Sequence, residues 1–151
     1  MGLDMYLSRK TYVKNWGNEN KYQVTVLADG KPAANIDSKR ISYIEEEFGY
    51  WRKANHIHKW FVDNVQNKVD DCGTYYVSRD QLTELAETCL KVLKDPETAS
   101  QWLPTTNGFF FGSAEYDEYY LNDVQDTLRI CTEAINSPND GSSSFYYHSS
   151  W

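Results

Sequence analysis

Four side chains suited to binding recur at helical spacing in the middle of the chain: Arg52, Asn55, His56 and Trp60. An arginine guanidinium can hold a phosphate or a carboxylate through two parallel hydrogen bonds. A tryptophan ring can stack on a base or fill a pocket of a partner. As a unit these residues fit either a nucleotide-like ligand or the centre of a protein interface. The alternative is that the helix is packed on both sides and that Trp60 belongs to the core.

A second set of candidate binding residues follows the phenylalanine run Phe109–Phe111: Tyr116, Asp117, Tyr119 and Tyr120. Three consecutive phenylalanines between glycines predict a buried strand or an extended plug. The glycines allow tight turns that can bring backbone N–H groups towards a ligand. The neighbouring carboxylates work against an anion at this place, so the segment itself favours a cationic partner.

The histidines and acidic residues between these two sets give weaker signals. His56 and His58 diverge by about 200° on a helix, so one metal ion cannot readily take both. We expect His58 to be a hydrogen-bonded core histidine and His56 to face outward with Trp60. Asp70 and Asp71 could serve a metal or acid–base chemistry, although a solvated loop is the interpretation we favour.

The elements that must position these residues form a predicted α+β domain covering residues 1–151. Strands are predicted at Leu3–Leu7, Tyr22–Leu27 and Ile41–Tyr50, and a final strand is predicted at Phe145–Trp151. Within the third strand, Glu45–Glu47 could instead form a helical turn. Helices are predicted at Arg52–Gln66, from Ser78 to Asp95 and from Glu115 onwards. The order of elements predicts a small antiparallel sheet packed against about three helices, with the C-terminal segment docking as a strand.

The predicted helix Arg52–Gln66 carries an anomaly. Its apolar stripe holds Ala54, His58, Phe61 and Val65, and the opposite side holds Arg52, His56, Lys59, Trp60 and Asp63. A tryptophan on the polar side of an amphipathic helix is unusual. On this reading Trp60 is exposed and available to a partner, whereas a helix packed on both sides would bury it.

Composition narrows the class of function. The net charge of −7 disfavours direct binding to nucleic-acid phosphates. Hydrophobic residues make up 40% and aromatic residues 15%, which is typical of a globular, aromatic-rich domain. The three cysteines are too far apart for a local metal site, and their odd number fits poorly with a disulfide framework. No signal peptide, membrane-spanning helix, nucleotide-binding loop or nucleophile motif is present, so we expect a cytoplasmic protein without a cofactor.

Several segments have distinctive amino-acid sequences. They are MGLDMYL at 1–7, GYWRKAN at 49–55, IHKWFV at 57–62, FFFGS at 109–113 with EYDEYY at 115–120, and FYYHSSW at 145–151. In these segments, from end to end, the chain resembles a family of small uncharacterised proteins encoded by bacterial phages and prophages. The resemblance implies a phage accessory gene acting in the cytoplasm of the bacterial host, where such proteins often block host defence machinery. It implies no activity and no catalytic residue.

These observations predict a non-enzymatic phage accessory binding protein that acts as an anti-defence inhibitor. Its partner would be a host protein that it occludes or a nucleotide-like signal that it sequesters. A small metal-assisted hydrolase using Asp70, Asp71 and a histidine is one alternative. A self-assembling structural or regulatory phage protein, and hence a homo-oligomer, is another.

Overall fold

The computed structural model of the chain describes residues 2–15 and 22–151. Its strands are β1 (Asp4–Tyr12), β2 (Leu27–Ala28), β3 (Lys31–Pro32), β4 (Tyr43–Arg52), β5 (Thr74–Val77) and β6 (Ser143–Ser150). Its α-helices are α1 (Asn55–Asn64), α2 (Arg79–Lys94), α3 (Ala99–Trp102) and α4 (Glu118–Asn136), with single 3-10 turns η1 (Ser38–Arg40) and η2 (Pro96–Thr98).

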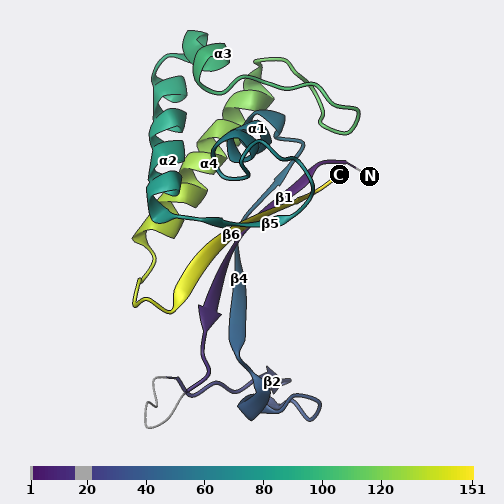
Figure 1. The fold of residues 1–151 in the computed structure, drawn as a ribbon, viewed down its shortest axis with the longest axis vertical. Coiled ribbons are helices and arrows are strands. Elements are labelled where there is room, and N and C mark those ends of the chain that lie inside the picture. Colours follow the sequence, from purple (N-terminus) through teal and green to yellow (C-terminus); the bar gives the residue numbers. More distant parts are fainter. Residues whose placement is uncertain (1, 16–21) are drawn as a thin grey trace.

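The sheet has four antiparallel strands in the order β4-β1-β6-β5. Figure 1 shows the helices gathered on one side of this sheet, while β1 and β4 extend beyond them towards β2. Alternation in β1 separates the two faces: Leu3, Met5 and Leu7 are buried beneath the helices, and the residues between them lie on the other face. The predicted α+β fold is confirmed.

The C-terminal segment docks as a strand, as predicted, and it does so beside the first strand of the chain. Ser143–Ser150 pairs with both β1 and β5. Phe145 and Tyr147 point into the core, and the Tyr147 ring stacks on Phe61 with centroids 3.9 Å apart. The predicted strand extended to Trp151, but this residue lies beyond the end of β6 and is 46% exposed.

The junction between β4 and α1 differs from the prediction. The third strand is confirmed in type, runs to Arg52 and includes Glu45–Glu47. The helix begins at Asn55, because Lys53 adopts the left-handed conformation (φ 57°) that ends the strand and turns the chain. Arg52 is therefore the last residue of a strand, not the first residue of a helix.

Side-chain caps set where the two long helices begin. Ser78 caps α2 through a capping box with Gln81, and the helix ends at Lys94, before the predicted Asp95-Pro96 stop. Helix α4 begins at Glu118 rather than at Glu115, because the Asp117 side chain accepts a hydrogen bond from the Tyr120 backbone N–H and caps the helix there.

Each of the two long helices buries a cysteine. Cys89 of α2 and Cys131 of α4 are buried free cysteines. Burial raises the pKa of both thiols, that of Cys131 to about 12. Both cysteines therefore act as small hydrophobic residues in the interface between α2 and α4.

The predicted strand Tyr22–Leu27 is mostly wrong. Only Leu27 and Ala28 pair, with Lys31 and Pro32, across the Asp29-Gly30 turn. Both turn residues have positive φ (52° and 76°), as a two-residue hairpin turn requires. β-branched and aromatic residues form a strand only beside a pairing partner, and residues 22–26 do not join the four-stranded sheet.

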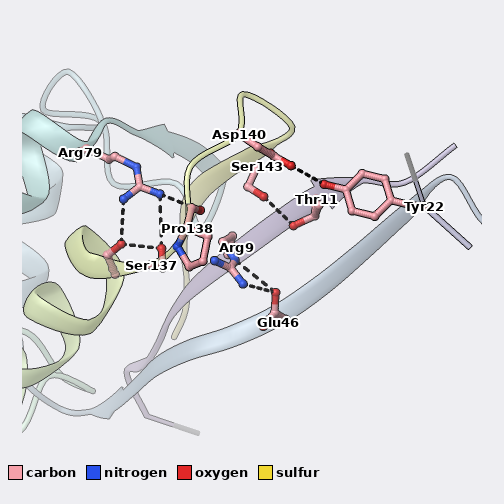
Figure 2. A network of polar contacts seen from close by, with 10 residues as sticks. Arg9, Thr11, Tyr22, Glu46, Arg79, Ser137, Pro138, Asp140 and Ser143 are labelled. Atoms are coloured by element: carbon pink, nitrogen blue, oxygen red, sulfur yellow. Dashed lines mark hydrogen bonds and ion pairs between the residues drawn. The ribbon is translucent and has the colours of Figure 1, made fainter. Parts of the chain in front are cut away.

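Side-chain contacts join the outer end of β1 to its neighbours (Figure 2). Arg9 donates two hydrogen bonds to the Glu46 carboxylate, at 3.1 and 2.7 Å, and Thr11 lies 2.8 Å from the Ser143 hydroxyl. At the foot of α4, Arg79 donates to the backbone oxygens of Ala134 and Ile135. These contacts hold the β1–β4 extension and the α4–β6 turn to the rest of the domain.

No helix within residues 2–15 and 22–151 is both long and apolar enough to cross a membrane.

Candidate functional site

A cleft of about 310 Å³ lies where the end of β4, the start of α1, the loop before α4 and the first turns of α4 meet. We call it the Arg52–Asp123 cleft. It is lined by Arg52, Lys53, His56, Gly112, Ser113, Glu115, Asp117, Tyr119, Tyr120, Asn122 and Asp123. Five of the eight residues that the sequence singled out therefore share one concave site.

The wall of the cleft depends on a close approach between two backbone segments. Gly112 has φ +83°, and a Cβ atom placed on it would lie 2.9 Å from the Cβ atom of Lys53. Any larger residue would push the loop away from the β4–α1 junction. Lys53 is fixed in turn, because its backbone N–H donates to the Leu3 carbonyl oxygen at 2.7 Å.

Asn55 positions the loop that forms this wall. Its side-chain amide donates to the carbonyl oxygens of Phe111 (3.0 Å) and Ser113 (2.8 Å). Its side-chain oxygen accepts from the Thr106 backbone N–H at 3.0 Å. Asn55 is buried and does not line the cleft. This predicted binding residue therefore supports the wall of the cleft and does not itself face a ligand.

His56 is buried beside the cleft, and the expectation that it faces outward is wrong. Its ring is stacked on Tyr120 with centroids 4.1 Å apart, and only 3% of the residue is exposed. Burial lowers the pKa of His56 from 6.5 to about 4, and the nearby Tyr120 backbone opposes this shift to a smaller extent. The imidazole is therefore neutral at pH 7. Its Nε2 atom is buried and has no hydrogen-bond partner in the described part of the chain.

The charges of the cleft come from two different segments. Arg52 and Lys53 bring cations from the β4–α1 junction, whereas the loop before α4 and the helix itself bring Glu115, Asp117 and Asp123. Burial, and then the charges of Asp126 and Asp117, raise the pKa of Asp123 to about 6. A ligand that carries an anionic group and several N–H donors would find partners for both.

The tyrosines of the cleft differ in exposure. Tyr120 is buried, and its hydroxyl donates to the Leu103 carbonyl oxygen at 2.7 Å. Burial raises its pKa, so this hydroxyl stays protonated. Tyr119 is 80% exposed and offers the free ring of the site. Tyr116 packs edge-on against Tyr120 outside the lining, and its hydroxyl accepts from the Thr105 backbone N–H.

Trp60 does not belong to the site, and the prediction that it is exposed is wrong. It is only 7% exposed and packs edge-on against Phe61 within the core cluster. Helix α1 is buried around most of its circumference, since Asn55, His56, Ile57, His58, Trp60 and Phe61 are all buried. The exposed side that remains is narrow and carries Lys59 and Asp63, and Trp60 does not lie on it.

The phenylalanine run was also misjudged. Phe109–Phe111 forms neither a strand nor a buried plug, and Phe109 is 95% exposed. The segment is a turn closed by a hydrogen bond from the Phe111 N–H to the Gly108 carbonyl oxygen. Phe111 alone packs against the core.

His58 is a core histidine with hydrogen-bond partners, as predicted. Its Nδ1 lies 2.7 Å from the Tyr147 hydroxyl, and its Nε2 lies 3.0 Å from both carboxylate oxygens of Asp70. Asp70 also accepts from the indole N–H of Trp151 at 3.1 Å. Asp71 accepts from the Gly73 N–H and the Tyr75 hydroxyl. These contacts join α1, the following loop and β6 to one another.

Within residues 2–15 and 22–151, no group of three or more histidine, cysteine, aspartate or glutamate side chains is arranged so that it could hold a metal ion. The carboxylates proposed for a hydrolase, Asp70 and Asp71, instead make the hydrogen bonds described above.

Several lining residues were missed by the sequence reasoning, above all Lys53 and Asp123. Asp123 follows Asp117 and Tyr120 at intervals of three residues, so helical spacing could have grouped them on one side of α4. Lys53 had no such signal, because its place depends on the sharp turn between β4 and α1.

The chain was compared with protein-family models, with curated proteins and with solved structures, and no match was found in any of the three comparisons.

Proposed function

We propose that this protein is a non-enzymatic binding protein that captures a small, nucleotide-like ligand in the Arg52–Asp123 cleft. One observation carries the proposal: the buried Nε2 atom of His56 has no partner among the described residues, and it belongs to a side chain that lines the same cleft as Arg52. An unsatisfied buried polar atom is costly, so a ligand that reaches it through a small shift of the cleft wall gains a hydrogen bond that the fold itself does not make.

The remaining lining fits the parts of such a ligand. Arg52 and Lys53 suit a phosphate. The exposed ring of Tyr119 suits stacking on a base, and the carboxylates of Asp117 and Asp123 suit the N–H donors on a base edge. The volume of about 310 Å³ lies at the lower end of the range for small-molecule sites, which favours a single nucleotide over a large cofactor.

The biological role that we propose is anti-defence by sequestration. It rests on the resemblance of the sequence to phage and prophage proteins, because a small phage protein that binds a nucleotide signal can withdraw it from a host defence system. The negative charge of the chain is compatible with this role, since the cations that meet the phosphate are local to the cleft.

Two measurements test the binding function. Mass spectrometry of small molecules released on heating should identify a stoichiometric nucleotide-like compound from protein purified from bacteria. Calorimetric titration with nucleoside mono-, di- and cyclic phosphates should show affinity that falls about tenfold or more in Arg52→Gln, because one charge-assisted pair is lost. Arg40→Gln is the matched control, because Arg40 is an exposed arginine of η1 whose partner is Asp37. Equal affinity in both variants would refute the proposal.

A second candidate function is occlusion of a host protein surface. It is favoured by exposed aromatic residues, above all Tyr119 of the cleft and Phe109 of the turn that precedes Gly112. Exposed aromatic side chains are frequent anchors of protein interfaces. A stoichiometric host protein retained in a pull-down by wild-type protein, and lost with Phe109→Ser, would favour this mechanism over ligand capture.

A further inference from the structure

The face of the sheet turned away from the helices carries a cluster of aromatic rings. We call it the open face and define it by Tyr6, Tyr50, Tyr76, Tyr146, His148 and Glu45. Tyr6 lies opposite Tyr50 on one neighbouring strand and opposite His148 on the other, with ring centroids 5.3 and 6.2 Å away. Tyr146 lies opposite Tyr76 with centroids 6.1 Å apart.

The rings differ in exposure. Tyr76 is 59% exposed and Tyr50 is 43% exposed, and Tyr6, Tyr146 and His148 are partly exposed, whereas the alternate residues of β1 beneath the helices are fully buried. A groove of about 450 Å³ lies on this face, with Tyr6, Tyr146 and His148 in its lining. The rings lie across four paired strands, and the linings of the groove and of the Arg52–Asp123 cleft have no residue in common.

The charge of the groove points to a cation. Glu45 is the carboxylate in its lining, and no lysine or arginine of the described chain lines it. Lys10 lies opposite Glu45 in the strand register, outside the groove lining, and makes a contact of this kind, since its Nζ lies 4.6 Å from the centroid of the Tyr43 ring. A positive group over tyrosine faces and beside a carboxylate is stabilised by both.

We propose that the open face docks a basic extended segment of a partner protein, with arginine or lysine side chains inserted between Tyr6, Tyr146 and Glu45. Alternate residues of an extended chain point to one side, so every second basic residue reaches the sheet. The net charge of −7 attracts such a segment over distance. Single-stranded nucleic acid also stacks on aromatic sheets, but its phosphates would meet Glu45 and the negative charge of the whole chain.

The test uses the full-length protein and a labelled peptide of alternating arginine and threonine, with fluorescence anisotropy as the readout. The same peptide with citrulline in place of arginine keeps the shape and removes the charge. We expect the arginine peptide to bind in a one-to-one complex, the citrulline peptide not to bind, and the affinity to fall about fivefold in Tyr6→Leu and in Tyr146→Leu, because a cation–π contact is lost. Circular dichroism checks that each variant is folded.

Matched variants separate a specific site from general attraction to an acidic protein. Glu45→Gln should weaken binding about threefold, whereas Glu133→Gln removes the same charge from the exposed side of α4 and should have no effect. Tyr119→Ser alters the cleft and should leave peptide binding unchanged. Equal losses in the two glutamate variants, unchanged affinity in both tyrosine variants, or tighter binding of a thymidine oligonucleotide than of the arginine peptide would each overturn the proposal.

Discussion

Two histidines of α1, His56 and His58, are both buried, yet they lie in regions of the molecule that are built differently. His58 meets Tyr147 and Asp70 at its two ring nitrogens, and Trp151 completes the cluster. His56 stacks on Tyr120 and leaves Nε2 without a partner among the described residues, beside a cleft. Burial alone does not distinguish a structural histidine from a binding one. The difference lies in whether the fold satisfies the hydrogen bonds of the ring.

The largest effect on stability is expected in the His58 region. His58→Leu leaves the Tyr147 hydroxyl and the Asp70 carboxylate without the partner they share. We expect the free energy of unfolding to fall by about 3 kcal/mol. Urea denaturation followed by tryptophan fluorescence measures it. A loss below that of a typical exposed substitution would show that the cluster contributes nothing to the fold.

Asn55 connects the two regions, because it lies between the histidine helix and the loop of the cleft. Asn55→Ala removes three hydrogen bonds to that loop, from which we expect a loss of about 2 kcal/mol. The loop should also loosen, so amide hydrogen exchange should accelerate in residues 105–114. Unchanged exchange there would contradict the positioning role of Asn55.

The pH dependence of stability reports on the cleft. Because the pKa of His56 is lowered to about 4, only the unfolded chain binds a proton between pH 6.5 and 4, and His56 makes stability fall as the pH falls through this range. The slope from His56 alone is at most about 1.4 kcal/mol per pH unit. Asp123 acts in the opposite direction, because its pKa is raised to about 6 and the folded state binds its proton first.

The two effects can be separated by one substitution. In Asp123→Asn the compensation is removed, so stability should fall more steeply between pH 6 and 4 than in the wild type. In His56→Phe the Asp123 effect remains alone, so stability should rise relative to the wild type as the pH falls through the same range. Denaturant midpoints at a series of pH values measure both. Parallel curves for all three proteins would show that His56 and Asp123 do not have these shifted pKa values in the folded protein.

The smallest effect is expected on the exposed side of α1. Lys59 forms an ion pair with Asp63 at 2.7 Å, one turn along the helix. Lys59→Ala should cost less than about 0.5 kcal/mol, because the pair is solvated. It should leave ligand binding unchanged and therefore serves as the control for variants of the cleft. A loss of unfolding free energy as large as that of Asn55→Ala would contradict the difference expected between the exposed and the buried side of α1.

Patterns that depend on local chemistry were readable from the sequence. The cap at Ser78, the alternation in Phe145–Tyr147 and the core position of His58 follow from short-range rules. Residues whose environment depends on packing from two sides were not. Trp60 looked exposed because the helical wheel of α1 shows polar residues around it, but the surrounding elements cover that side as well.

The candidate site was predicted in part for the same reason. The spacing on α1 and at the start of α4 identified Arg52, His56 and Tyr120, but nothing in the sequence indicated that the two segments meet. Their meeting depends on the turn at Lys53 and on Gly112, whose backbone conformations bring the loop against the strand end. Phe109 was misassigned because hydrophobicity alone does not distinguish a buried run from an exposed turn.

The Nε2 atom of His56 carries the proposed ligand binding, and one pair of measurements tests it most directly. The affinity for the tightest-binding nucleotide of the titration series is measured for the wild type and for His56→Phe. Phenylalanine keeps the stacking on Tyr120 and removes Nε2. We predict that the wild type binds and that the variant, still folded, binds about tenfold more weakly, as expected for one lost hydrogen bond. Equal affinities, or a wild type that binds none of the nucleotides, would contradict ligand capture through His56.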